Sequence, residues 1–323
     1  MAGRTSRKKN LVKEAVQAQS GSAKKSSNVP VIVTIVAVCM IALITIELYF
    51  AVNKETKMSK GPELITSWHG SYKGMWGINQ CGNYIYAMDH DQNQIHKYNK
   101  MTGELVAVYT AGKQEAIWAT EDMEGITYVL VKNSNVILKF KDKKPAGTLT
   151  LEDVKTPNNN MVINSKDMLY ITDTSNSKIF EYDLDGEKKA EFGGNGQGNA
   201  QFKTGIGRIF VDGKDNLYVL SSPVETVKEF DQDGKFIREW KLGIKAPLGF
   251  ENLAIAPDGN IYVNDFNDSQ VLVFTQAGKL IGRFNRDLSG NFIITAPASI
   301  TGGNDGQIYV CTHDIGVFKP IKY

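Results

Sequence analysis

A short strand motif built around tyrosine recurs six times along the chain, and this repeat constrains the fold more than any other feature. The copies are IYAMD, TYVLV, LYITD, LYVLS, IYVND and IYVCT, with tyrosines at Tyr86, Tyr128, Tyr170, Tyr218, Tyr262 and Tyr309. Successive tyrosines are 42 to 48 residues apart. A period of this length is typical of architectures in which each repeat packs on its neighbours, such as propellers and solenoids.

Each repeat contains four short strand patterns and no helical periodicity. An apolar strand such as RIFVD precedes the tyrosine strand, and a third strand such as KIFEYD and a tight turn into a fourth follow it. Four strands in about 45 residues, joined by Asp-Gly and Gly-rich turns, are typical of a propeller blade. The sixth repeat stops after its third strand, and GPELITSW (Gly61–Trp68) can supply the fourth. We therefore predict an all-β, six-bladed β-propeller over residues 61–323, closed by an N-terminal strand.

Two long segments follow the blade pattern most completely. They are FGGNGQGNAQFKTGIGRIFVDGKDNLYVL, from Phe192 to Leu220, and DGNIYVNDFNDSQVLVFTQAGKLIGRF, from Asp258. On these segments the chain resembles the NHL family of six-bladed propellers, and the resemblance extends over all six repeats. It implies the fold and leaves the function open, because this architecture hosts enzymes and binding platforms alike.

The segment before the repeats has the composition of a membrane anchor. PVIVTIVAVCMIALITIELYFAV (Pro30–Val52) is long enough to span a bilayer as a helix, and its acidic residue, Glu47, is expected near the outer interface. Residues 1–60 hold ten basic and three acidic side chains, a net charge of +7, whereas the 27 basic and 32 acidic residues that remain give −5. We predict a basic, disordered tail (1–28), a single transmembrane helix acting as a signal anchor (29–52), a short tether (53–60) and the propeller (61–323). The positive-inside rule places the N-terminus in the cytoplasm and the propeller in the periplasm or outside the cell, at the plasma or inner membrane.

Three histidines are candidate metal ligands. His69, His90 and His313 fall in loops that emerge on one face of the predicted ring, where propellers usually bind their ligands. The resemblance to NHL-type lyases implies that such a set can hold a metal at the ring centre, which leaves Zn²⁺ or Ca²⁺ open as a cofactor. The loops that follow the second strand of a blade lie one strand out from the axis, however. This position favours histidines that are at the surface or hydrogen-bonded to protein, and it favours no cofactor.

The starts of the inner strands are candidate ligand-binding positions. The residues ten positions before each tyrosine are Trp76, Trp118, Asn160, Arg208, Asn252 and Ser299. Glu251 directly precedes Asn252. Six-bladed lactonases hold calcium-type ions with Glu, Asn and Asp at the tunnel, and oxygen ligands suit such cations. Because these positions hold few oxygens, and include an arginine and two tryptophans, they equally favour a peptide or a small anionic ligand at the tunnel mouth.

These observations support two functions. The first is a membrane-anchored, non-catalytic platform that binds a protein, peptide or glycan within a membrane-associated complex. The alternative is a metal-dependent hydrolase or lyase, lactonase-like or amidating-lyase-like, with its site at the central tunnel. The acidic charge of the propeller argues against nucleic acid as a partner. Cys81 and Cys311 are expected near opposite faces and therefore unpaired.

Overall fold

The described part of the protein is built entirely from β-strands. The structure, a computed structural model, describes residues 61–70, 73–155, 157–221, 226–243, 252–292, 294–303 and 305–321. Within these residues it contains no helix long and apolar enough to cross a membrane. The predicted tail, membrane helix and tether (1–60) lie outside the described residues.

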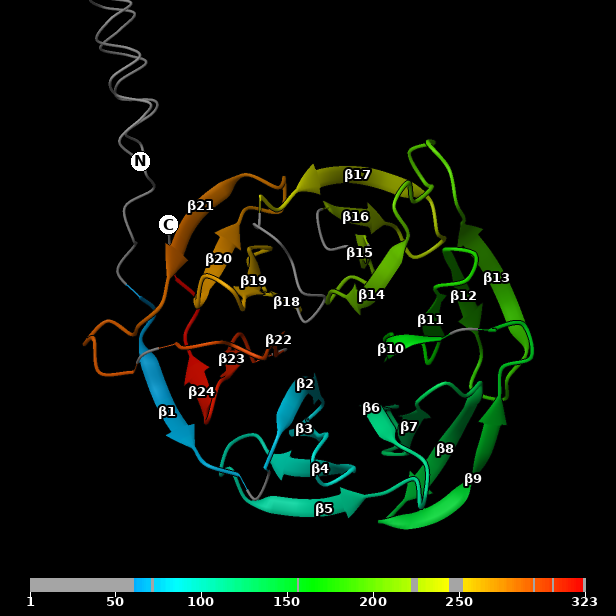
Figure 1. The fold of residues 1–323 in the computed structure, drawn as a ribbon, viewed down its shortest axis with the longest axis horizontal. Helices are drawn as coiled ribbons and strands as arrows, with labels where there is room; N and C mark the ends of the chain where they lie inside the picture. The colour runs from blue at the N-terminus through cyan, green and yellow to red at the C-terminus, as the bar shows by residue number, and fades with distance from the viewer. Residues whose placement is uncertain are drawn as a thin grey trace, which may run out of the picture. The chain divides into compact units, whose positions relative to one another are not determined.

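In the described residues, twenty-four strands form six sheets of four strands each, which surround a central axis as the blades of a propeller (Figure 1). Blade 1 contains β2 (Met75–Cys81), β3 (Tyr84–Asp89), β4 (Gln94–Asn99) and β5 (Leu105–Tyr109). Blade 2 contains β6 (Ala116–Glu121), β7 (Thr127–Val131), β8 (Val136–Lys141) and β9 (Lys144–Thr150). Blade 3 contains β10 (Pro157–Ile163), β11 (Leu169–Asp173), β12 (Lys178–Tyr182) and β13 (Lys188–Gly193).

The remaining blades follow the same order from the axis outward. Blade 4 contains β14 (Ile206–Val211), β15 (Leu217–Ser221), β16 (Thr226–Phe230) and β17 (Phe236–Lys241). Blade 5 contains β18 (Leu253–Ile255), β19 (Ile261–Asp265), β20 (Gln270–Phe274) and β21 (Leu280–Phe284). Blade 6 contains β22 (Ser299–Gly302), β23 (Ile308–Cys311), β24 (Ile315–Phe318) and, as its outermost strand, β1 (Leu64–Trp68).

The predicted closure by an N-terminal strand is confirmed. β1 pairs antiparallel with β24, with Ser67 opposite Gly316 and Trp68 opposite Ile315. The first strand of the ring thereby completes the last blade, and no blade is left with three strands. An ion pair adds to this junction, since the Nζ of the buried Lys100 of blade 1 lies 2.8 Å from Oδ2 of the partly exposed Asp305 of blade 6.

The repeated tyrosines all lie in the second strand of their blade and are at most 1% exposed. Five of them donate a hydrogen bond to a carboxylate; Tyr128, for example, reaches Asp122 Oδ2 at 3.1 Å. The sixth, Tyr262, accepts one from the backbone N–H of Ile321. The aromatic ring of each tyrosine therefore packs in the apolar layer between blades while its hydroxyl remains hydrogen-bonded. This explains why tyrosine recurs at this position in every blade.

Candidate functional site

The inner strands surround the tunnel, and each pairs with only one neighbour in its sheet (Figure 1). Its other edge carries backbone N–H and C=O groups that need partners. Side chains from the neighbouring blades supply several of these partners and form an inter-blade hydrogen-bond ring. Its members are Asn79, Trp118, Asn160, Arg208, Asn252 and Ser299.

The hydrogen-bond ring runs through all six blades. From blade 1, Asn79 donates to Ala119 O (2.9 Å), and from blade 2 the Trp118 indole donates to Met161 O (2.9 Å). Asn160 of blade 3 donates to Ile209 O (2.6 Å) and accepts from Ile209 N (3.1 Å). Arg208 donates to Asn252 Oδ1 (2.5 Å), Asn252 donates to Ser299 Oγ (2.6 Å), and Ser299 Oγ accepts from Ile78 N of blade 1 (3.1 Å).

Four of the predicted ligand-binding residues thus join blades, and two of them, Asn160 and Asn252, have both ends of the side chain occupied. Asn160 and Asn252 are fully buried, and the carbonyl and amino ends of both side-chain amides are hydrogen-bonded to protein. Their position at the start of the inner strands is as predicted, and their role toward a ligand stays a prediction. Glu251 lies outside the described residues.

Trp76 occupies the same register in blade 1 and has a different environment. The β2–β3 register shifts between Met75 and Gly77, so Trp76 sits at a bulge, and 46% of its surface is exposed. Its indole stacks against the imidazole of His90, with ring centroids 4.7 Å apart and 45° between the planes. An exposed indole at the mouth of a tunnel is a typical ligand contact.

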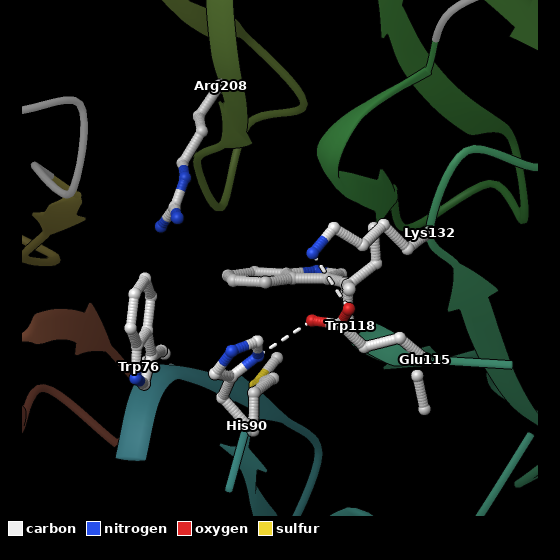
Figure 2. Close-up of a pocket in the computed structure, with 10 residues that line it drawn as sticks. Trp76, His90, Glu115, Trp118, Lys132 and Arg208 are labelled. Carbon is white, nitrogen blue, oxygen red and sulfur yellow. Dashed lines mark hydrogen bonds and ion pairs between the residues drawn. The ribbon is translucent and has the colours of Figure 1, made fainter. Parts of the chain in front are cut away.

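Trp76 lines a pocket of about 100 Å³, which we call the tunnel-mouth pocket (Figure 2). Its lining comes from blades 1, 2 and 4 and consists of Trp76, Gly77, Met88, His90, Glu115, Ala116, Ile117, Trp118, Lys132 and Arg208. The structure therefore brings together three predicted tunnel-mouth residues, Trp76, Trp118 and Arg208, with one of the three candidate histidines, His90.

Glu115 is the central charged group of the tunnel-mouth pocket. One carboxylate oxygen lies 2.7 Å from His90 Nδ1, and the other lies 2.7 Å from Lys132 Nζ. Burial acts to raise the pKa of Glu115, but the hydrogen bond from Lys132 and the charges of Lys132 and His90 outweigh it, so the pKa lies below its ordinary value. Glu115 is therefore ionised at neutral pH and holds the imidazole of His90 in one orientation.

Local hydrogen bonds fix the loops that carry His90 and Glu115. The buried carboxylate of Asp89 accepts from the backbone N–H groups of Lys73 (2.7 Å), Gly74 (3.2 Å) and Gln92 (3.1 Å). Asn93 bridges to the next blade, donating to Gln114 O (2.8 Å) and accepting from Ala116 N (2.9 Å), the two neighbours of Glu115. The His90–Glu115 contact is thus held by backbone on both sides.

Arg208 completes the tunnel-mouth pocket from β14. Its guanidinium lies 5.7 Å from the centre of the Trp118 ring, within the range of a cation–π interaction. Trp118 itself is 2% exposed, and its indole N–H is held by Met161 O. In Figure 2 the guanidinium and the two indoles border the space toward which the second ring nitrogen of His90 points.

Two charged members of the pocket, Glu115 and Lys132, are absent from the sequence-based candidates. Lys132 had a signal in the repeat, since it follows the second strand of blade 2 as His90 follows that of blade 1, 42 residues earlier. Glu115 had none, because it is one acidic residue in a link between blades and its partners come from elsewhere in the chain.

The other histidines have separate partners. His69 Nδ1 lies 2.6 Å from Asp314 Oδ1 at an exposed site, and His313 is exposed. His96 is buried, and its two ring nitrogens lie within hydrogen-bond distance of Tyr98 and Gln94. No group of three His, Cys, Asp or Glu side chains that could hold a metal occurs among the described residues. The three-histidine metal site stays a prediction, and the donors that are described do not fit one. Cys81 and Cys311 are both free thiols, as predicted.

The protein is a six-bladed β-propeller with a polar, aromatic-lined pocket at one mouth of its tunnel. Residues 131–251 match the family model described as the SMP-30/gluconolactonase/LRE-like region. The comparisons do not name the NHL family, and no curated protein matches the chain.

Several solved structures share the fold. One is a streptogramin B lyase, with 14% identity, coverage of 80% of this chain and 87% of the other, and a TM-score of 0.55. Another is a catalytically inactive virginiamycin B lyase from Staphylococcus aureus with quinupristin, with 15% identity, coverage of 79% and 99%, and a TM-score of 0.56. A third is a protein of unknown function from Bacteroides caccae, with 12% identity, coverage of 75% and 91%, and a TM-score of 0.52. At these identities the likeness concerns the fold alone.

Proposed function

We propose that the protein is a hydrolase or lyase that opens a cyclic ester in the tunnel-mouth pocket, with His90 as general base. The observation that carries this proposal is the contact between Glu115 and His90 Nδ1 at 2.7 Å, in a pocket that Arg208 also lines. The match of residues 131–251 to a gluconolactonase-type model supports it, as does the fold shared with streptogramin B lyase. Both findings favour the enzymatic alternative over a non-catalytic platform.

Glu115 determines which nitrogen of His90 can act as the base. A carboxylate only accepts hydrogen bonds, so the neutral imidazole carries its proton on Nδ1 and leaves the lone pair on Nε2. That nitrogen points into the space bordered by Trp76, Trp118 and Arg208 (Figure 2). A base oriented by a carboxylate in this way is the arrangement that general-base catalysis requires.

The same groups serve hydrolysis or elimination of an ester. In hydrolysis, His90 takes a proton from water, the hydroxide adds to the ester carbonyl, and Arg208 stabilises the oxyanion; the ester C–O bond then breaks and the alcohol oxygen receives the proton from His90. In elimination, His90 removes a proton from the carbon next to the alkoxy carbon, a C=C bond forms and the carboxylate leaves. Both routes end in a carboxylate, whose charge Arg208 complements.

The test is proton release from a panel of lactones and cyclic depsipeptides, measured by pH-stat on the purified full-length protein in detergent. Product mass separates the routes, because hydrolysis adds one water and elimination adds none. We expect His90→Gln to lower kcat/KM by about 100-fold or more, as loss of a general base does. Met101→Ala, at a side chain exposed by 71%, serves as the control and should retain activity. Turnover that is unchanged in His90→Gln, or no turnover across the panel, would overturn the proposal.

A non-catalytic binding platform is the second candidate. The 46% exposure of Trp76 beside a cation-bearing pocket supports it, since indoles and arginines dominate protein binding sites. In that case a pull-down with the full-length protein recovers a protein, peptide or glycan partner that Trp76→Ala does not recover, and no lactone is consumed. Recovery of the same partner by Trp76→Ala would rule out this pocket as the docking site.

We further propose that Pro30–Val52 anchors the propeller outside the cytoplasm at the plasma or inner membrane. Seven basic residues precede this segment and three follow it closely, and this asymmetry supports the orientation. Protease added to intact cells or spheroplasts should then remove the propeller. Full protection of the propeller, with digestion only after lysis, would contradict it.

A further inference from the structure

A second pocket lies at the opposite mouth of the tunnel, and we call it the far-mouth pocket. Its volume is about 100 Å³. The tunnel-mouth pocket uses the first residues of inner strands, such as Trp76 and Gly77 of β2, whereas the far-mouth pocket uses the last residues, such as Gln80 and Cys81 of β2. All six inner strands contribute to its lining. The far-mouth pocket is therefore formed by the closed ring and by no single blade.

The lining of the far-mouth pocket is uncharged. Within the described part of the chain it includes no acidic or basic side chain. Desolvation raises the pKa of the Cys81 thiol to about 11, so this group is neutral at pH 7. The two charges that act on the thiol, Lys97 and Glu121, form an ion pair with each other. An ion that entered this pocket would lose its water without gaining an opposite charge, and this cost favours neutral ligands.

The far-mouth pocket has an apolar half and a polar half. Blades 3, 4 and 5, which are consecutive in the ring, contribute apolar side chains at the ends of β10, β14 and β18, among them Ile163, Phe210 and Ile255 (Figure 1). These three side chains are only partly buried in the protein. Blades 6, 1 and 2 contribute neutral polar groups, among them Asn79 and Thr301. A matching ligand has an alkyl part for one half and a neutral polar group for the other.

Two polar atoms of the polar half are left for a ligand. Asn79 Nδ2 donates to Ala119 O at 2.9 Å and to Cys81 Sγ at 3.2 Å, whereas its Oδ1 receives no hydrogen bond from the described residues. Thr301 Oγ1 accepts from the N–H of Gln80, the residue after Asn79, at 3.2 Å, and its own hydrogen has no acceptor among them. An alcohol matches this acceptor and this donor, because its hydroxyl group donates one hydrogen bond and accepts another.

We infer that the far-mouth pocket binds a short, uncharged aliphatic alcohol, with the hydroxyl at Asn79 and Thr301 and the alkyl chain against the apolar half. The volume sets the size of the part that enters. Engineered apolar cavities of about 150 Å³ hold benzene, so a pocket of about 100 Å³ holds roughly five non-hydrogen atoms. This second ligand site goes beyond the reaction proposed for the tunnel-mouth pocket and does not depend on it.

Three probes with five non-hydrogen atoms each test the ligand class: 1-butanol, its isomer methyl propyl ether, and butylammonium. They are titrated into the full-length protein in detergent, labelled with ¹³C at the methyl groups of isoleucine and methionine. 1-Butanol should shift the methyls of Ile163 and Ile255 along a saturating curve with a millimolar dissociation constant. The ether cannot donate to Asn79 and should bind about three- to tenfold more weakly. Butylammonium should bind at least about tenfold more weakly than 1-butanol.

Two methyl groups elsewhere show whether the binding is local. Ile237, which is 42% exposed on the outer strand β17, reports unspecific effects of alcohol and detergent. Met88 reports binding in the tunnel-mouth pocket, which it lines. Neither should follow the saturating curve. Equal affinity for 1-butanol and the ether would overturn the hydroxyl site, and equal affinity for butylammonium would overturn the selection for neutral ligands. A curve that does not saturate, or that Met88 or Ile237 shares, would overturn the far-mouth site itself.

Variants assign the contacts. Thr301→Val removes the donor at nearly constant shape and should weaken 1-butanol about three- to tenfold, and Thr301→Ser should restore it. Val211→Thr places a hydroxyl in the apolar half and should weaken 1-butanol and the ether together. Val108→Thr, the same change at a side chain exposed by 41% on the outer strand β5, is the matched control and should change nothing. Circular dichroism checks that each variant is folded. Unchanged affinity for 1-butanol in folded Thr301→Val and Val211→Thr would refute the assignment.

Discussion

Replacing Asn160 with alanine cuts the inter-blade hydrogen-bond ring between blades 3 and 4. Asn160 is fully buried and serves both the C=O of Ile209, at 2.6 Å, and its N–H, at 3.1 Å. Alanine leaves both backbone groups without these partners, and each buried, unsatisfied group costs about 1–3 kcal/mol. We expect the free energy of unfolding to fall by about 2–5 kcal/mol, which lowers the melting temperature of a domain of this size by about 5–15 °C.

The assay is thermal and urea unfolding of the full-length protein, followed by circular dichroism. Asn260→Ala is the control, because the side-chain amide of Asn260 donates to its near neighbour Asp258 within a turn, and the loss should stay under about 1 kcal/mol. Asn160→Asp should be damaging at neutral pH as well, since it places a carboxylate oxygen against Ile209 O. If Asn160→Ala and Asn260→Ala unfold at the same midpoint, the inner-strand edges do not depend on the hydrogen-bond ring and the reasoning is wrong.

Three further predictions concern other buried groups. Burial lowers the pKa of His96, so below the ordinary histidine pKa of about 6.5 the unfolded chain binds a proton that the folded propeller does not. The free energy of unfolding should therefore decrease as the pH falls below that value. The decrease should be smaller in His96→Gln, and urea midpoints measured across pH give both results. Lys100→Met removes the cationic partner of Asp305, a partly exposed carboxylate. Burial acts to raise the pKa of Asp305, but the hydrogen bond from Lys100 and other hydrogen bonds outweigh it, so the pKa lies below its ordinary value. We expect a loss of about 1–2 kcal/mol at neutral pH that disappears as pH falls through the lowered pKa of Asp305, measured by thermal melts. Desolvation raises the pKa of Cys81, a partly exposed thiol, to about 11, and burial also raises that of Cys311. Peptide mass spectrometry should therefore find both unlabelled by iodoacetamide at pH 7.5 until urea unfolds the propeller, and labelling in the folded protein would contradict these raised pKa values.

The sequence predicted the ring well because its signals are periodic and local. Alternation, turn residues and the recurrent tyrosine repeat in every blade, and the missing strand of the sixth repeat identified β1 as the closing strand. The same register placed Trp76, Trp118 and Arg208 at one mouth of the tunnel. The anchor predicted at Pro30–Val52 lies outside the described residues, so the structure does not bear on it.

The site was predicted less completely, for two physical reasons. An asparagine at an inner strand can bind a ligand or satisfy a strand edge, and only the distances to Ile209 show which partner Asn160 has. The contact between His90 and Glu115 joins blade 1 to the link before blade 2, and no periodic signal specifies such a pair. Pairs of this kind depend on how blades face each other, which one sequence does not reveal.

The bulge at Trp76 bears on how new specificities can arise in this architecture. The link between blades 1 and 2 runs through Asn79, three residues further along β2, and that hydrogen bond remains when residue 76 changes. Substitutions there alter the mouth of the tunnel and leave the joint between blades intact. A library randomised at this position should therefore contain a high proportion of folded proteins, and selection can act on ligand choice separately from stability.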